Sequence, residues 1–254
     1  MQPTILFVDI DSTLVENRFS FKVISTLVGE IAAATGLAPE DIGRSIGEEN
    51  NRRQLDDPDN PLTMDWDDIL DTIAARNGVQ LSRRVIDLWR EYADPGMVDV
   101  LDNASHVFQQ IKAPHRTLVI ATKGLRKYQD VVLETVGLAS LFDDILTPDI
   151  TGYLKTSPGY FARYTQTPTP TTFIQVGDHY YDDVICAKRN GFYAVMRAPI
   201  PELADLDPFE RPAHLLRYQE QIHTYPRQGT DVLPDAVVIS LEELPAVLPR
   251  LEAV

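Results

Sequence analysis

The chain has very little of the features that would assign it at once to a secreted or a membrane class. Cys186 is its only cysteine among 254 residues, so it cannot form a disulfide within itself. No apolar run approaches the roughly 18 residues of a membrane span, and the first residues lack the basic-then-apolar pattern of a signal peptide. We therefore expect a cytoplasmic protein with no membrane partner.

Basic residues are scarce relative to acidic ones. The chain carries 23 Lys and Arg against 38 Asp and Glu, a formal net charge of −15. Nucleic acids and anionic membranes bind basic surfaces, so we expect neither as a partner. An anionic substrate would have to be met by local cations or by a bound metal ion. The length allows one large domain or two smaller ones.

The first fifteen residues organise the rest of the chain. Thr4 to Val8 is a short apolar and β-branched run, which is typical of a strand buried on both faces. Asp9 ends the run, and Asp11 follows two positions later. Taken alone, the two carboxylates are explained equally well as turn-forming residues. They also fit a binding site, because ligands of parallel α/β sheets bind outside the carboxyl ends of the strands.

Residues 16–94 change in character. Helical spacing of apolar residues predicts helices over about 20–36, 39–50, 65–77 and 81–93, with a polar, proline-containing loop after residue 50. No convincing strand is visible in this part. We expect an all-helical cap at 16–94, inserted into a core made of residues 1–15 and 95–254.

From residue 95 onward, predicted strands alternate with predicted helices. Such alternation indicates an α/β fold with a parallel sheet and right-handed crossovers. The strands are expected at 117–121, 142–146 (a strand or a loop), 172–176, 192–196 and 236–239, and the helices at 98–111, 125–136, 158–164, after 183 to about 190, and 241–251. The segment 198–234 is a lid edge, an oligomer contact or a plain excursion, and we favour the excursion.

Polar residues follow several of these strands. Asp9 and Asp11 follow the first, Thr122 the second and Asp178 the third, while Lys155 precedes a helix that begins after Ser157. Each has an ordinary explanation in isolation, such as a turn or a solvated surface. Their joint occurrence indicates one pocket, because the carboxyl ends of parallel strands share one edge of the sheet.

The chemistry of this set is that of phosphoryl transfer. Several carboxylates in one pocket repel each other unless a cation joins them, and Mg²⁺ prefers oxygen ligands. We expect Asp9, Asp178 and Asp183 to hold Mg²⁺, with Asp182 as a weaker candidate. Lys155 would offset the remaining negative charge.

The same set supplies the groups for catalysis. A free carboxyl oxygen of Asp9 would attack phosphorus, and Asp11 would act as general acid and then as general base. Thr122 and backbone N–H groups around Ser12 and Lys123 would hydrogen-bond the phosphoryl oxygens.

Together these residues resemble the four motifs of the haloacid dehalogenase (HAD) superfamily, in the order of that family. The motifs are Asp9-Ile10-Asp11-Ser12-Thr13, Thr122-Lys123-Gly124, Lys155 and Gly177-Asp178-x₄-Asp183. The resemblance implies a Rossmann-like core, a helical cap of the C1 type, Mg²⁺ dependence and an aspartyl-phosphate intermediate. It also implies that the backbone carbonyl of Asp11 joins the metal ligands and that the substrate phosphate is bound by Ser12, Thr13, Thr122 and Lys123.

Four functions remain open at this point. The favoured one is a Mg²⁺-dependent phosphomonoester hydrolase acting on a small phosphorylated metabolite. A phosphomutase shares every motif. A 2-haloacid dehalogenase is disfavoured, because such members resemble D-x-x-x-T and need no acid at Asp11. A catalytically silent binding protein would have no need of all four motifs. A homodimer is an open alternative to a monomer.

The predicted cap says less about the substrate. A solvated helix end and loop is a better explanation of its polar residues than contact with a polar or anionic substrate. These residues are Arg44, Asn50, Asn51, Arg52 and Arg53. Trp66 and Trp89 are expected in the core of the cap rather than as stacking surfaces.

Overall fold

A six-stranded parallel sheet lies at the centre of the molecule, in the order β5-β4-β1-β6-β7-β8. The structure is a computed structural model, and it describes residues 2–57, 60–166, 168–222 and 232–253. The predicted α/β class is confirmed. The strands are β1 (Thr4–Val8), β4 (Arg116–Ala121), β5 (Asp144–Leu146), β6 (Thr172–Gly177), β7 (Tyr193–Arg197) and β8 (Ala236–Val238).

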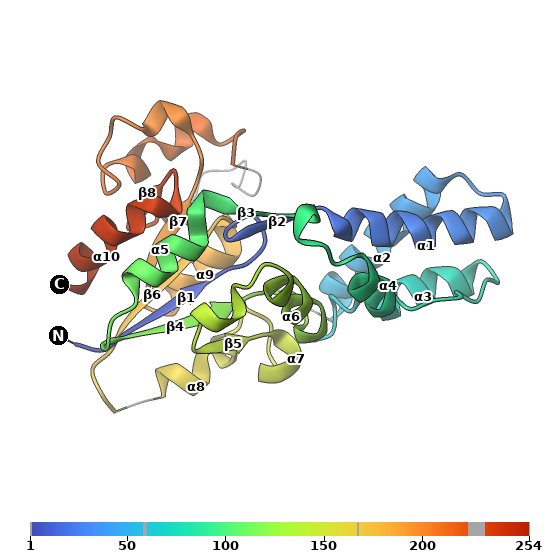
Figure 1. The fold of residues 1–254 in the computed structure, drawn as a ribbon, viewed down its shortest axis with the longest axis horizontal. Coiled ribbons are helices and arrows are strands. Elements are labelled where there is room, and N and C mark those ends of the chain that lie inside the picture. Colours follow the sequence, from blue (N-terminus) through green and yellow to red (C-terminus); the bar gives the residue numbers. More distant parts are fainter. Residues whose placement is uncertain (1, 58–59, 167, 223–231, 254) are drawn as a thin grey trace.

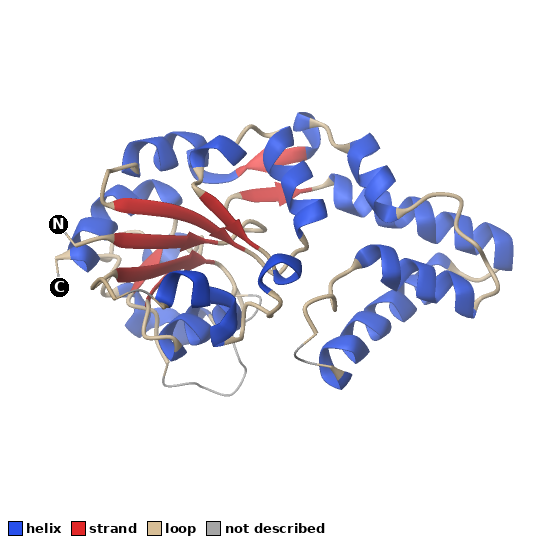
Figure 2. Ribbon diagram, turned by 90° about the horizontal axis from the view of Figure 1, so that it is seen from below, coloured by secondary structure: helices blue, strands red, loops and turns tan. Residues whose placement is uncertain are grey.

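Helices cover both faces of this sheet (Figure 2). Alternate residues of β1 point to opposite faces, with Leu6 and Val8 in one apolar cluster and Ile5 and Phe7 in the other. The first cluster includes side chains of α5 (Ala104–Ile111), α6 (Arg126–Thr135) and α10 (Leu244–Glu252), and the second includes side chains of α9 (Cys186–Arg189) and packs against α8 (Ala162–Thr165).

Four helices lie beyond one end of the sheet, opposite the two termini (Figure 1). They are α1 (Phe19–Thr35), α2 (Pro39–Asp56), α3 (Trp66–Arg76) and α4 (Val85–Tyr92). The helical character expected for this part is confirmed, but the end of the second helix at residue 50 is wrong. The helix continues for six residues because Arg52 and Arg53 bind the carboxylate of Glu49 one turn earlier.

A two-stranded antiparallel ribbon joins these helices to the sheet. It pairs β2 (Val15–Asn17) with β3 (Val98–Val100). The expectation of no strand in residues 16–94 is therefore wrong, and so is the single helix over 98–111. Asp102 and Asn103 have φ values of 47° and 58°, which an α-helix cannot accommodate, so α5 begins only at residue 104.

Several predicted α-helices are shorter than expected. The helix expected over 158–164 is a 3₁₀ turn at 158–161 followed by the short α8. The single helical turn α7 (Pro148–Thr151) was not predicted. The chain over 180–185 is a π-helical turn that leads into α9. Such turns often occur where side chains must be placed for function.

The described part of the segment 198–234 packs on the core. It contains two 3₁₀ segments, at 201–203 and 211–218, and buries Leu203, Leu215 and Ile222 in the cluster that also holds Phe7. The buried guanidinium of Arg211 donates to backbone carbonyls and to Glu243. This part lies beside α10 in Figure 1. The choice of a plain excursion over a lid edge or an oligomer contact stays a prediction, and residues 223–231 lie outside the described residues.

Among the described residues, no single helix has both the length and the apolar character of a membrane span. The pair α1 and α2 meets that test of length and composition only when taken together, across a bend of 119°.

Candidate active site

The register of the sheet explains how distant residues meet. Val8 of β1 lies opposite Ile120 of β4 and Val176 of β6. The residues that follow these positions are therefore neighbours at the carboxyl edge of the sheet. Asp9, Thr122 and Asp178 all line one cavity there, as the common edge predicts.

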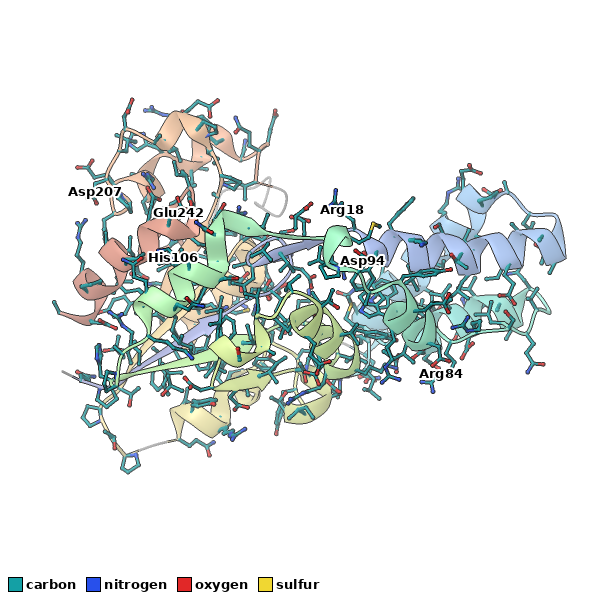
Figure 3. All side chains as sticks on the ribbon, in the orientation of Figure 1. Arg18, Arg84, Asp94, His106, Asp207 and Glu242 are labelled. Carbon is teal, nitrogen blue, oxygen red and sulfur yellow. The ribbon has the colours of Figure 1, made fainter. Side chains whose placement is uncertain are left out.

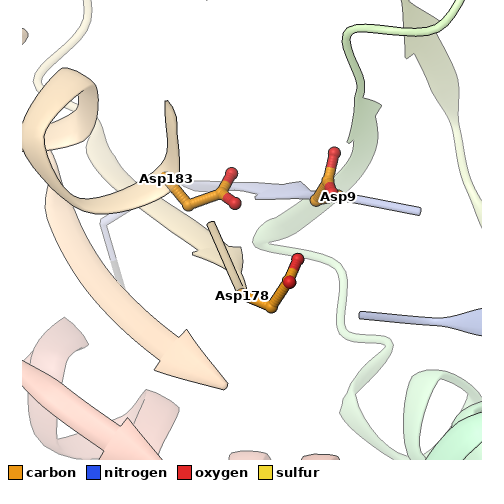
Figure 4. A group of neighbouring side chains, drawn as sticks. All are labelled: Asp9, Asp178 and Asp183. Atoms are coloured by element: carbon orange, nitrogen blue, oxygen red, sulfur yellow. The ribbon is translucent and has the colours of Figure 1, made fainter. Parts of the chain in front are cut away.

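Three carboxylates converge at this edge. Oxygens of Asp9, Asp178 and Asp183 lie within 4.8 Å of one another, and their side chains point toward a common space (Figure 4). The buried ammonium of Lys155 lies between two of them, 2.8 Å from Oδ1 of Asp9 and 2.6 Å from Oδ1 of Asp183. The arrangement leaves net negative charge and oxygen donors in one place, which suits a hard divalent cation.

Neighbouring groups hold two of these carboxylates in position. Thr13 is buried below the cavity and donates its hydroxyl hydrogen to Asp178. Asp183 accepts hydrogen bonds from Gln175 and from the backbone N–H of His179. Gly177 is required here, because a Cβ at this position would lie 2.1 Å from the carboxyl carbon of Asp183.

Asp11 faces the same cavity from the turn after β1. Its Oδ2 accepts a hydrogen bond of 2.9 Å from the amide of Gln129 on α6. Ser12, the next residue, has a φ of 56°, a left-handed conformation that usually favours glycine. Arg197 stabilises this turn by donating to the carbonyl of Ser12 at 3.0 Å, while it also binds Asp102.

Thr122 and Lys123 form the third side of the site. The hydroxyl of Thr122 accepts from the backbone N–H of Gly124, and its carbonyl accepts from the hydroxyl of Tyr160. The ammonium of Lys123 lies 2.9 Å from Asp182. Asp182 therefore faces a lysine in this structure, and it is absent from the group of three carboxylates that could hold a metal.

These residues border an open cavity of about 810 Å³. Its floor is made by the strand ends, and its opposite wall by residues from β2, α1, α3, α4, α6 and the chain before α3. Every predicted site residue except Thr13 lines the cavity. The wall opposite the strand ends consists of Glu16, Asn17, Ser20, Phe21, Ile24, Met64, Trp66, Trp89, Tyr128 and Gln129.

The crowding of negative charge shifts the acidity of these groups. Burial and the nearby charge of Asp9 raise the pKa of Asp11 to about 6, against the opposing hydrogen bond from Gln129. The same two causes raise the pKa of Asp178 to about 6. Burial also raises the pKa of Asp183, although Lys155 opposes that change.

Two contributing residues were not expected from the sequence. Gln129 lies on the buried face formed by Leu125, just before α6, and by Tyr128, Val132 and Leu133 of α6. A polar residue on an apolar helix face could therefore have indicated a role for Gln129. Arg197 ends β7 and gave no such signal, because its partners lie 95 and 185 residues away in the sequence.

The polar candidates of the helical region do not reach the cavity. Arg44 binds Asp41 and Arg52 binds Glu49, and both side chains are exposed, as the solvated interpretation expects. That interpretation is wrong for Arg53, whose side chain is 15% exposed and binds the buried carboxylate of Glu49. Neither Asn50 nor Asn51 lines the cavity. Trp89 packs against Phe19 and Tyr128 as a core residue would, but both it and Trp66 also line the cavity.

The fold and the site together define an enzyme with a Rossmann-like parallel sheet and a carboxylate-rich centre at its carboxyl edge. A family model described as haloacid dehalogenase-like hydrolase matches residues 3–191, and the chain belongs to this family of enzymes. It is also similar to the haloacid dehalogenase-like hydrolase domain-containing protein 3 of Bos taurus, at 27% identity over 139 residues. The match covers 52% of this chain and 55% of the relative, so it spans about half the length of that protein.

Solved structures share the fold over almost the whole chain. A HAD phosphatase from Thermococcus onnurineus has a TM-score of 0.68 at 21% identity, with 98% of each chain covered. A 2-haloacid dehalogenase from Pseudomonas syringae has a TM-score of 0.63 at 18% identity, covering 98% of this chain and 99% of that one. The HAD-hydrolase YfnB from Bacillus subtilis, whose structure is bound to magnesium, has a TM-score of 0.57 at 18% identity, with coverage of 98% and 99%.

Proposed function

We propose that this hydrolase is a Mg²⁺-dependent phosphomonoesterase that forms an aspartyl-phosphate on Asp9. The observation that carries the proposal is the convergence of Asp9, Asp178 and Asp183 within 4.8 Å, with Asp11 facing the same cavity. A dehalogenation site needs neither a cation site nor a second acid. Phosphate ester hydrolysis uses both.

The donor set fits the proposed ion. Asp9, Asp178 and Asp183 offer only carboxylate oxygens, and the backbone carbonyl of Asp11 is the fourth proposed ligand. When bound, Mg²⁺ would neutralise the charge of the carboxylates and of the incoming phosphate, which would otherwise repel each other.

The first step is attack by Asp9 on the phosphorus atom. Lys155 binds Oδ1 of Asp9, so it orients the carboxylate and leaves the other oxygen for attack. A bond forms between that oxygen and phosphorus while the bond from phosphorus to the ester oxygen breaks. Asp11 donates a proton to the departing oxygen, so the product leaves as a neutral alcohol.

The second step regenerates the enzyme. Asp11, now ionised, takes a proton from a water molecule, whose oxygen attacks phosphorus. The bond between phosphorus and Asp9 breaks, and inorganic phosphate leaves. Gln129 holds the Asp11 carboxyl in one orientation, which serves both proton transfers.

Other polar groups would bind the phosphoryl oxygens. The hydroxyls of Ser12 and Thr122 and the ammonium of Lys123 line the cavity beside Asp9. Thr13 is proposed to contribute through its bond to Asp178. We also propose that residues 16–94 act as a cap over the core formed by 1–15 and 95–254, with the β2–β3 ribbon as the connection.

The proposal is tested by measuring release of inorganic phosphate from a panel of phosphate esters, with and without added Mg²⁺ after treatment with a chelator. We expect release only with the metal, and at least a thousandfold loss in the Asp9→Asn variant, which keeps the size and shape of the side chain. Asp205→Asn is the matched control, because Asp205 is exposed and lies outside the cavity. Full activity of Asp9→Asn would refute the assignment.

The same assays separate the alternatives. A phosphomutase would give an isomerised ester with little free phosphate, and a dehalogenase would release halide from a 2-haloacid without added metal. A silent binding protein would turn over none of these compounds. A cytoplasmic location, the lack of nucleic-acid and membrane partners, and the choice between monomer and homodimer stay predictions.

A further inference from the structure

The wall of the cavity opposite the carboxylates is mainly apolar. Phe21 and Ile24 come from α1, Met64 from the chain before α3, Trp66 from the start of α3, and Trp89 from α4. Phe21 is 79% exposed although it borders the cavity, so it presents a bare aromatic ring at the opening. The polar residues of the wall are Glu16, Asn17, Ser20 and Gln129. Ser20 donates its hydroxyl hydrogen to the carbonyl of Asn17 and Gln129 donates to Asp11, so a polar leaving group would find few free partners there.

Cations are also missing from the cavity for any second anionic group. Among the described residues that line it, the only basic side chains besides His179 are Lys123 and Lys155. Lys155 is bound by Asp9 and Asp183, and Lys123 by Asp182. Both lysines lie on the side of the carboxylates, and no arginine is found in the described part of the cavity lining.

Several arginines of the helical region bind carboxylates outside the cavity. Arg53 and Arg76 bind the buried carboxylate of Glu49, and Arg84 binds Asp67. Figure 3 shows Arg84 at the lower edge of this region. The charged group that does face the cavity from the β2–β3 ribbon is Glu16, and it would repel an anion.

On the basis of the proposed phosphatase activity, we infer that the substrate is a phosphate monoester of an uncharged, mainly apolar alcohol. An ester whose leaving group carries a carboxylate or a second phosphate would place that charge near Glu16 and Asp11 without a partner. An unpaired charge in a partly desolvated site is strongly disfavoured. An apolar leaving group instead covers Phe21, Ile24 and Trp66.

The test compares three esters of primary alcohols, so that the reactivity of the leaving groups differs little. Benzyl phosphate has an apolar leaving group, glycerol 1-phosphate a neutral polar one, and 2-phosphoglycolate an anionic one. With Mg²⁺ present, we expect kcat/KM to be highest for benzyl phosphate and at least about tenfold lower for 2-phosphoglycolate, a difference of about 1.4 kcal/mol in transition-state binding.

Two arginine variants test whether the wall sets this preference. Phe21→Arg adds a cation at the cavity, and its exposed position makes it compatible with folding. We expect the ratio of kcat/KM for benzyl phosphate over 2-phosphoglycolate to fall about tenfold or more. Leu55→Arg is the matched control, because Leu55 is 80% exposed on α2 and does not line the cavity, and it should leave the ratio unchanged.

The possible failures are distinguishable. Equal or faster release from 2-phosphoglycolate by the unmodified protein would overturn the inference about the leaving group and leave the phosphatase proposal standing. An unchanged ratio in Phe21→Arg would overturn the role given to the wall. Absence of phosphate release from all three esters, together with no binding of vanadate as a mimic of the reacting phosphate, would overturn both proposals.

Discussion

Replacement of Lys155 by methionine isolates the electrostatic role of the one lysine that is buried at the site. Its ammonium lies 2.8 Å from Asp9 and 2.6 Å from Asp183, and the side chain is 1% exposed. Methionine keeps most of the apolar volume and removes the charge. The variant therefore leaves Asp9, Asp178 and Asp183 as three carboxylates with no positive charge between them.

The size of the effect follows from burial. Removal of one partner of a buried ion pair costs about 3–5 kcal/mol, because the remaining charge stays desolvated and unpaired. For a chain of this size, each kcal/mol corresponds to about 2–4 °C in Tm. We therefore expect the Tm of Lys155→Met to fall by roughly 6–20 °C in the presence of a chelator.

The assay is thermal unfolding followed by circular dichroism, with a chelator and then with Mg²⁺. Lys188→Met is the control, because Lys188 binds Asp235 in a pair that is about one-third exposed on the lysine side and is worth at most about 1 kcal/mol. Addition of Mg²⁺ should reduce the difference in Tm between Lys155→Met and the unmodified protein, because the ion supplies positive charge to the same carboxylates. The double variant Lys155→Met/Asp183→Asn should recover part of the lost stability.

The reasoning would be refuted by a Lys155→Met variant as stable as the Lys188→Met control in the presence of the chelator. A loss of stability that neither Mg²⁺ nor the second substitution reduces would also refute it, since it would point to packing rather than charge.

Two further predictions concern positioning and acid stability. Gln129→Leu removes the hydrogen bond to Asp11 and fills a similar volume. We expect kcat to fall about tenfold while KM and Tm stay nearly constant. An equal rise in KM would contradict a positioning role. Hydrogen bonds from Arg52 above all, and from Arg53, lower the pKa of Glu49 from 4.5 to about 2. The carboxylate therefore stabilises the fold above pH 4.5, and this contribution is lost as the pH falls toward 2. In Glu49→Gln, the free energy of unfolding measured in urea should depend less on pH across that range. A pH profile identical to that of the unmodified protein would show that the ion pairs contribute nothing.

Local patterns were sufficient for the main elements. The run Thr4–Val8 is apolar and β-branched throughout, and all five residues are buried in the central strand. Regular apolar spacing likewise predicted α1, α3 and α6 to within a few residues. These signals succeed because each depends on neighbours within one or two turns of the chain.

Short elements were not predicted, because they depend on residues far away in the sequence. The strand Val98–Val100 exists because it pairs with Val15–Asn17, more than 80 residues earlier, and three residues alone carry too weak a pattern. The start of α5 only after Asn103 depends on two positive φ values. Neither feature has a signature that can be seen within a short window of sequence.

The order and types of residues at the predicted strand ends were enough to indicate an acidic, metal-binding site and a hydrolase family. The parallel register of β1 and β6 decided that Asp9 and Asp178 meet. The packing of the π-helical turn and of the loop after α7 decided that Asp183 joins them and that Lys155 lies between Asp9 and Asp183. The apolar wall of the cavity was likewise decided by tertiary packing, since Phe21, Met64 and Trp89 belong to separate helices and linkers. Sequence determines which groups are present, whereas distances between groups far apart in the chain depend on how the sheet and the helices pack.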